Sequence, residues 1–173
     1  KRILKEHQLK AATHLYLSKN GANFSVPGSG KTSVALAVYE KLRLEGKVNT
    51  LFVVGPPSCF QPWRDEFQET LGRIPNYQIL AGGNVLARKS KYFTTANQKP
   101  ELYLTSYQTF LQDHKDVETF MRRQGVDIFL VIDEAHYIKK IEGNWATSIL
   151  DISKYAKFRC VLTGTPMPRS YTD

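Results

Sequence analysis

Two short segments of the sequence carry residue types that could bind phosphate groups and a metal ion. The first is the run Gly28–Gly30 followed by Lys31 and Thr32, and the second is the acidic pair Asp133–Glu134. Each follows an apolar stretch of the kind that forms a buried strand. Residues placed after parallel strands gather at one edge of the sheet, where ligands bind in open α/β folds. The two segments therefore predict one shared site for a phosphate compound and its metal ion.

The first segment has the features of a phosphate-binding loop. Glycines let the backbone curl so that several N–H groups face one concavity, and the start of the following helix favours a polyanion. Lys31 would reach the β- and γ-phosphates of ATP, and the Thr32 hydroxyl would bind Mg²⁺. Ser25 stands where the common motif has Gly or Ala; the alternative is a Gly-rich turn without a ligand. The candidate nucleotide-binding residues of the loop are Pro27, Gly28, Ser29, Gly30, Lys31 and Thr32.

The acidic pair follows the apolar run 126–132, which predicts a strand buried on both faces of a parallel sheet. Asp133 would hold Mg²⁺ directly or through water, and Glu134 would orient and deprotonate the water that attacks the γ-phosphorus. Lys31 and Glu134 are thus the candidate catalytic residues, and Thr32 and Asp133 the candidate metal ligands. The alternative is that the two acids cap a following helix. The presence of a candidate phosphate-binding loop makes this alternative less favoured.

Composition narrows the class of protein. The chain has 173 residues, which is enough for one domain with a substantial core. No apolar run reaches the roughly 18 residues of a membrane span, so no membrane partner is expected. Cys59 and Cys160 lack metal-like spacing and favour a reducing intracellular location, in the cytoplasm, nucleoid or nucleus. The net charge of +8 favours a polyanionic partner, with Arg88–Lys91 as one basic cluster, although a generic basic surface is the alternative.

Alternating patterns predict the scaffold that positions these residues. The expected strands are 22–26, 50–55, 77–80, 101–105, 127–132 and 158–163. Apolar residues at helical spacing lie between them, and they are Ala35, Val38 and Leu42, then Phe60, Trp63, Phe67 and Leu71, then Trp145, Ile149 and Ile152. We expect residues 81–100 to form a loop with a short helix. Strands that alternate with helices predict an α/β fold with a mostly parallel sheet.

The order of the motifs resembles the first RecA-like lobe of superfamily 2 helicases, and within them the switch/sucrose-nonfermenting (Snf-type) DNA translocases. Thr163, Gly164 and Thr165 favour this type over RNA helicases, which usually carry Ser-Ala-Thr there. Motor subunits of restriction enzymes are the nearest alternative. The resemblance covers nearly the whole chain. It rests on Leu4–Gln8, Gly28–Thr32, Phe52–Ser58 with Trp63, Leu104–Tyr107, the Asp-Glu-Ala-His box within Asp133–Lys140, and Leu162–Pro166.

The resemblance implies a RecA-like P-loop NTPase fold with three α/β/α layers, an ATPase that uses ATP and Mg²⁺, and movement along duplex DNA. Gln8 would recognise adenine. His136, Thr163, Gly164 and Thr165 would pass the state of the γ-phosphate to the DNA-facing side; His136 could instead be structural. Contacts to DNA would be mainly to its phosphate backbone and would come from Ser58, Thr105 and Ser106. Tyr107 and Trp63 could simply belong to the core.

The resemblance also implies a second RecA-like lobe, in the same polypeptide, whose arginines complete the site. The sequence lacks an initiator Met and ends just after the last motif, so we expect residues 1–173 to be a single ATP-binding domain cut from a longer chain. Alone, it would be nearly inactive. Lys140 and Met167–Arg169 differ from the usual family residues and favour a divergent branch. An RNA helicase, a restriction or defence motor and a non-catalytic nucleotide-binding scaffold remain alternatives.

Overall fold

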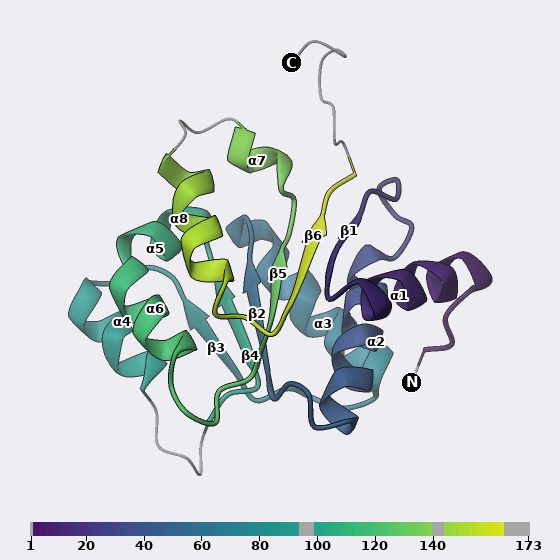
Figure 1. Ribbon diagram of the computed structural model, residues 1–173, viewed down its shortest axis with the longest axis horizontal. Coiled ribbons are helices and arrows are strands. Elements are labelled where there is room, and N and C mark those ends of the chain that lie inside the picture. Colours follow the sequence, from purple (N-terminus) through teal and green to yellow (C-terminus); the bar gives the residue numbers. More distant parts are fainter. Residues whose placement is uncertain (1, 94–98, 140–143, 165–173) are drawn as a thin grey trace.

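A computed structural model describes residues 2–93, 99–139 and 144–164 (Figure 1). Its strands are β1 (Asn20–Asn23), β2 (Thr50–Val54), β3 (Tyr77–Leu80), β4 (Leu102–Thr105), β5 (Ile128–Ile132) and β6 (Phe158–Leu162). They form one six-stranded sheet in the order β1-β6-β5-β2-β4-β3. Every neighbouring pair runs parallel, which confirms the predicted α/β class.

Helices cover both faces of this sheet. They are α1 (Glu6–Ser18), α2 (Lys31–Leu44), η1 (Pro57–Cys59), α3 (Phe60–Leu71), α4 (Val85–Tyr92), α5 (Tyr107–Gln112), α6 (His114–Met121), α7 (His136–Lys139) and α8 (Asn144–Ser153). Helices α1, α2 and α3 pack on one face, and α4, α5, α6 and α8 pack on the other (Figure 1). The result is the three-layer α/β/α arrangement. Among the described residues, no helix is both long and apolar enough to cross a membrane.

The strands supply both halves of the core by simple alternation. All residues of β2 and β5 are buried, as central strands of a sheet covered on both faces require. On β2, Leu51 and Val53 face α1–α3, whereas Phe52 and Val54 face the opposite helices. The helical spacing read from the sequence marks the buried faces of α2, α3 and α8; the side chain of Trp145 lies outside the described residues. The buried members of these sets are Ala35, Val38, Leu42, Phe60, Trp63, Phe67, Ile149 and Ile152.

The first strand ends earlier than the predicted strand 22–26. The Asn23 side chain accepts hydrogen bonds from the Ser25 backbone N–H at 3.0 Å and from the Ser25 hydroxyl at 2.6 Å. This local turn competes with the ladder of the sheet and ends β1 at Asn23. Phe24 and Val26 consequently lie in the loop, 55% and 69% exposed. The other strands agree with the predicted bounds to within about one residue, the usual uncertainty of such boundaries.

The order of the strands decides which loops meet. All six strands are parallel, so the loops that follow their carboxyl ends lie at the same edge of the sheet. Strand β6 lies between β1 and β5. The segments after these three strands are therefore neighbours, and they contain the Gly-rich loop, Thr163–Gly164 and Asp133–Glu134. Segments more than 100 residues apart in sequence are brought together in this way.

Candidate nucleotide-binding site

The Gly-rich loop joins β1 to α2 and depends on its glycines. Gly28 and Gly30 have φ angles of 78° and 82°, in the left-handed region where side chains are disfavoured. A Cβ atom on Gly30 would also lie 2.3 Å from Nε2 of Gln8. Gly30 is the N-cap of α2 and carries no side chain that could occupy the first N–H groups of the helix. The start of α2 therefore offers backbone donors to an anion, as predicted for this motif.

Lys31 is the first residue of α2, and its side chain bonds back to the Gly-rich loop. Its Nζ donates to the carbonyl oxygens of Ser25 at 3.1 Å and Val26 at 3.4 Å. The ammonium group is therefore held by the backbone of the loop that precedes α2. A phosphate oxygen carries more charge than a carbonyl and would compete for the same donor. Thr32 lies beside Lys31 at the start of α2.

One cavity of about 500 Å³ joins the two predicted segments. Its wall includes the start of α2, the loop after β2 and the acidic pair after β5. The structure thus brings together residues that the sequence assigned to phosphate, metal and catalysis. The lining consists of Arg2, Pro27, Gly28, Gly30, Lys31, Thr32, Ser33, Pro56, Ser58, Cys59, Pro62, Glu66, Asp133 and Glu134.

Asp133 is buried at the end of β5 and is held by four hydrogen bonds. Its N–H donates to Val54 O at 2.8 Å, and its carbonyl oxygen accepts from the Tyr107 hydroxyl at 2.6 Å. Oδ1 accepts from the Glu134 N–H at 2.9 Å, and Oδ2 accepts from Trp63 Nε1 at 2.8 Å. Burial raises the pKa of the Asp133 carboxyl, while the hydrogen bond from Trp63 opposes that rise.

Glu134 has an unusual backbone for its residue type. Its φ is 50°, a left-handed conformation that is costly for a residue with a side chain and is often found at functional sites. Its side chain is 38% exposed, and its Oε2 lies 3.2 Å from Nδ1 of His136. The same Nδ1 lies 3.4 Å from Oγ1 of Thr163. His136 therefore stands between the candidate base and the end of β6.

The segment after β6 touches the Gly-rich loop directly. Thr163 is buried and its N–H donates to Asn23 O at 3.3 Å, which ties it to the end of β1. A Cβ atom on Gly164 would lie 3.0 Å from the Pro27 ring and 3.4 Å from Nζ of Lys31. Gly164 thus allows the close approach of these two segments. Thr165, the last predicted coupling residue, lies outside the described residues, as do Lys140 and Met167–Arg169.

Gln8 lies behind the Gly-rich loop rather than on the cavity wall. Its Nε2 donates to Ser29 O at 2.9 Å, and its Oε1 accepts from the N–H of Lys5 at 2.9 Å. The side chain is buried by these contacts. The structure therefore connects Gln8 to the Gly-rich loop, and its predicted role in recognising adenine stays a prediction.

The three predicted contacts to nucleic acid differ in exposure. Ser58 is exposed on η1 and lines the cavity. Thr105 is fully buried, and its hydroxyl donates to Leu80 O at 3.1 Å. The Thr105 hydroxyl is therefore directed into the protein and away from an outside phosphate, and a contact from the backbone near Thr105 stays a prediction. Ser106 is half-buried and caps α5 by accepting from the Thr109 N–H at 3.1 Å.

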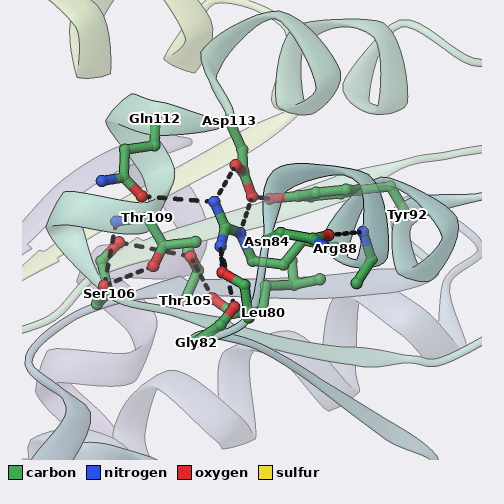
Figure 2. Close-up of polar contacts among 12 residues, drawn as sticks. Leu80, Gly82, Asn84, Arg88, Tyr92, Thr105, Ser106, Thr109, Gln112 and Asp113 are labelled. Atoms are coloured by element: carbon green, nitrogen blue, oxygen red, sulfur yellow. Dashed lines mark hydrogen bonds and ion pairs between the residues drawn. The ribbon is translucent and has the colours of Figure 1, made fainter.

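Arg88 corrects another expectation, because it does not belong to an exposed basic cluster. Figure 2 shows its guanidinium between α4 and the α5–α6 junction. Two of its nitrogens each donate to the buried Asp113 carboxylate at 2.8 Å. A third donates to the carbonyl oxygens of Gly82 at 2.9 Å and Gly83 at 2.8 Å. Tyr92 adds a hydroxyl to Asp113 at 3.1 Å. Arg88 therefore links α4 to the loop after β3 and to the α5–α6 junction. Its guanidinium bonds to these groups and is not directed at an outside phosphate.

The residues around the cavity fit Mg²⁺ bound together with a nucleotide. In the described part of the chain, no three His, Cys, Asp or Glu side chains are grouped to hold a metal ion by themselves. Mg²⁺ does not need such a cage, because it is usually held by one or two protein oxygens, substrate phosphates and water. Thr32 and Asp133 supply two oxygens on the same cavity. Each carboxylate oxygen can accept more than one bond, so Asp133 retains capacity for a metal ion.

A larger cavity lies at the other edge of the sheet and has different chemistry. It measures about 650 Å³, and its walls include Lys19 and Phe158 at the amino ends of β1 and β6. Lys47 bonds to Glu45 at 2.7 Å and Lys157 bonds to Asp127 at 2.8 Å, so much of its positive charge is already paired. The volume of a cavity alone therefore does not identify the candidate phosphate site, because the smaller of these two cavities contains the Gly-rich loop and the acidic pair.

The fold and the cavity together define a RecA-like ATPase lobe of the superfamily 2 helicase type. Residues 2–168 match the family model described as the res subunit of type III restriction enzymes, and the chain belongs to this family. It is the first RecA-like lobe of a Snf-type member. The predicted resemblance is thereby confirmed.

Individual relatives agree with this assignment. Helicase swr1 of Schizosaccharomyces pombe is 33% identical over 180 residues, which cover 98% of this chain and 13% of that protein. The DNA excision repair protein ERCC-6-like of Mus musculus is 28% identical over 175 residues, covering 97% of this chain and 14% of that protein. The chain therefore spans about one seventh of the length of these two relatives.

Two solved structures share the fold. The Sulfolobus solfataricus SWI2/SNF2 ATPase core in complex with dsDNA has a TM-score of 0.70 and 25% identity, over 96% of this chain and 33% of that one. The ATPase core domain of the same source has a TM-score of 0.74 and 21% identity. The three-layer architecture with a parallel sheet is therefore that of a SWI2/SNF2 ATPase core.

Proposed function

We propose that this chain is the ATP-binding lobe of a motor that couples ATP hydrolysis to movement along duplex DNA. The observation that carries the proposal is the meeting of Lys31, Asp133 and Glu134 on one cavity of about 500 Å³. These residues come from distant segments and meet because β6 lies between β1 and β5. The double-stranded DNA in the related Sulfolobus structure supports duplex DNA as the partner.

The phosphate and metal roles follow from the cavity. The N–H groups at the start of α2 and Nζ of Lys31 would bind the phosphates of ATP. Thr32 and Asp133 would hold Mg²⁺, which supplies charge neutralisation on the phosphates when it is bound. The burial of Asp133 excludes bulk water from the carboxylate and strengthens its interaction with a cation.

Glu134 is suited to act on the attacking water. Its carboxylate is partly exposed at the cavity, so it can accept a proton from a water molecule placed there. The contacts of His136 with Glu134 and with Thr163 provide a short route from this carboxylate to the end of β6. We propose that these residues report the state of the γ-phosphate to the surface that holds DNA.

Contacts to DNA would use the phosphate backbone. Ser58 is exposed beside the nucleotide cavity, and Ser106 lies at the same edge of the sheet, after β4. A net charge of +8 adds long-range attraction for a polyanion. These contacts would not read base sequence, so affinity would fall steeply with salt.

A second RecA-like lobe in the same polypeptide would complete the site. The chain covers 33% of the related Sulfolobus core, so that core contains further protein outside the matching region. We propose that the additional lobe supplies arginines to the γ-phosphate from the open side of the cavity. In related phosphoryl transfers an arginine finger is worth roughly 10³–10⁵ in rate.

The test is the ATPase activity of the full-length protein with no nucleic acid, with duplex DNA, with single-stranded DNA and with RNA, over a series of salt concentrations. Stimulation by duplex DNA that fades with salt is the expected result. Stimulation by RNA alone would indicate an RNA helicase instead. Stimulation by none of them would indicate a nucleotide-dependent switch or scaffold.

A restriction or defence motor is the second candidate, favoured by the description of the matching family as a type III restriction subunit. It shares the ATPase and the duplex DNA partner but differs in its product. Incubation of the full-length protein with long duplex DNA and ATP separates the two, because a restriction system would cut the DNA and a translocase alone would leave it intact.

Glu134→Gln in the full-length protein separates a motor from a scaffold. The amide keeps the size of the side chain but cannot take a proton. We expect turnover to fall by about 10²–10⁴-fold, as for loss of a general base, while ATP binding persists. Unchanged function in cells after this substitution would favour the scaffold.

An intracellular location is part of the same proposal. Cys59 and Cys160 are both free thiols, as a reducing compartment allows. ATP and DNA, the proposed ligands, are likewise found inside cells.

A further inference from the structure

The indole of Trp63 contacts the candidate metal ligand in a way that core packing alone does not require. Trp63 lies on α3, is 0% exposed, and belongs to the same core cluster as Phe60 and Phe67. Its ring is explained by this packing. Packing does not explain the partner of its N–H. A buried indole N–H needs an acceptor, but any backbone carbonyl could serve. Here the acceptor is Oδ2 of Asp133, at 2.8 Å.

This bond adds a second restraint on the rotation of the Asp133 carboxylate. The backbone of Asp133 is held through Val54 and Tyr107, and Oδ1 is held by the N–H of Glu134. Rotation of a carboxylate about its terminal bond is soft, with broad minima. The bond from Trp63 to Oδ2 comes from a different layer of the protein and, together with the bond to Oδ1, restrains the plane of the carboxylate.

Close packing prevents the carboxylate from moving away as a whole. A Cβ atom on Gly55 would lie 3.2 Å from Cβ of Asp133 and 2.9 Å from Sγ of Cys59. The space beside Asp133 is therefore filled by the backbone of Gly55 and by the thiol. Without the bond from Trp63, the Asp133 carboxylate would therefore rotate rather than shift. Its oxygen lone pairs would then turn away from the cavity that Asp133 shares with Thr32.

We propose that Trp63 is a positioning residue for metal binding: its N–H holds the Asp133 carboxylate in the orientation that receives Mg²⁺ together with ATP. The inference rests on the proposed function, because it assumes a Mg²⁺–nucleotide complex in the cavity. Residues that orient metal ligands typically change metal affinity by about 10–100-fold when they are replaced. Trp63 belongs to that class by its distance, its burial and the identity of its acceptor.

The test uses Trp63→Phe in the full-length protein, because Phe keeps an aromatic ring in the core but has no N–H. Binding of a fluorescent ATP analogue is titrated with Mg²⁺ and is repeated in EDTA. We expect the Mg²⁺ concentration for half-saturation to rise about tenfold or more, and the affinity in EDTA to stay unchanged. Phe67→Leu is the matched control. It removes packing from a fully buried position of the same helix, one turn further on, without changing the bond to Asp133.

Should Trp63→Phe fail to fold, 3-benzothienylalanine at position 63 replaces the N–H by sulfur with almost the same shape. Equal Mg²⁺ dependence of the folded variant and the wild type would overturn the inference. So would an equal shift in Phe67→Leu, since packing alone would then explain it. If the wild type binds no nucleotide, or binds it equally well after Lys31→Ala, the proposed function itself fails. The inference would then fail with it.

Discussion

At the residue scale, the site combines groups whose conformations would be unfavourable elsewhere. Gly28 and Gly30 adopt left-handed backbone, and Glu134 does so with a side chain. Asp133 is buried although its side chain is an acidic carboxyl group. Each departure has a local compensation: the glycines carry no Cβ, and the acid receives hydrogen bonds from Trp63 and Glu134. Such strained and buried groups persist where the surrounding structure holds them, and their gathering at one edge of the sheet supports the proposed site there.

Gly164 gives a prediction at this scale. Its φ is not in the left-handed region, so alanine is acceptable to the backbone, but a Cβ would lie 3.0 Å from the Pro27 ring and 3.4 Å from Nζ of Lys31. Gly164→Ala should therefore displace the phosphate-binding loop. We expect ATP affinity to fall about tenfold while the fold persists, since overpacking of this kind typically costs about 1–3 kcal/mol. Calorimetric titration of the full-length protein with Mg²⁺·ATP measures the effect.

The matched control removes the obstacle. Pro27→Ala deletes the ring atoms that the new Cβ would meet, so the double variant Gly164→Ala with Pro27→Ala should recover much of the lost affinity relative to Pro27→Ala alone. Wild-type affinity in Gly164→Ala would show that the loop moves aside without cost and would contradict the explanation.

At the scale of elements, buried or half-buried ion pairs add polar links between helices and loops that also share apolar packing. Arg88 joins α4, the loop after β3 and the α5–α6 junction through Asp113, Gly82 and Gly83 (Figure 2). On the other face, Glu40 of α2 bonds to Arg43 and to Arg73, which follows α3; Arg73 also bonds to Glu101, just before β4. These links set how the helices sit on the sheet.

Glu40 makes this network sensitive to acid. Hydrogen bonds, mainly from Arg43 and also from Arg73, lower the pKa of Glu40 from 4.5 to about 2. Because the folded pKa lies below the unfolded value, the stabilisation is complete above about pH 4.5 and is lost as the pH falls toward 2. Glu40→Gln should thus lower the free energy of unfolding at pH 7 by about 1–2 kcal/mol, and the difference from wild type should shrink below pH 4.5.

Urea unfolding of the wild type and Glu40→Gln between pH 7 and pH 3 measures this. Glu6→Gln is the control, because Glu6 pairs with Lys10 in the solvent and should contribute little at any pH. A loss in Glu40→Gln that does not depend on pH would indicate packing or hydrogen bonding by the uncharged form, and would contradict the ionic explanation.

The elements also show what the sequence could predict. Apolar runs bounded by turns locate the strands of this sheet because central parallel strands are buried on both faces. The bond from Trp63 to Asp133 could not be predicted, since nothing in the spacing says that α3 and the end of β5 are neighbours. Arg88 was misjudged for the same reason: its buried partner, Asp113, is 25 residues away along the chain. The burial of Thr105 follows from the position of β4 inside a sheet that helices cover on both faces, and the hydrogen bond of its hydroxyl to Leu80 could not be predicted from the spacing.

At the scale of the whole molecule, charge in the cavity limits what this lobe can do alone. The cationic residues on the described cavity wall are Arg2 and Lys31. Arg2 already bonds to Glu66 and Glu69, so Lys31 remains as the cation for the phosphates. Negative charge develops on the γ-phosphoryl group during transfer and needs further cations. The remaining charge must come from Mg²⁺ and, as proposed, from a second lobe.

Residues 1–173 alone should therefore bind Mg²⁺·ATP weakly and hydrolyse it very slowly. Relative to the full-length protein with duplex DNA, we expect single-turnover hydrolysis to be slower by about 10³-fold or more, the effect of a missing arginine finger. Lys31→Ala in the same chain gives the background from contaminating ATPases. Robust hydrolysis by the isolated lobe, stimulated by duplex DNA and lost in Lys31→Ala, would contradict this expectation. It would mean that the cavity described here supplies the transition-state charge by itself, and that a second lobe serves movement rather than chemistry.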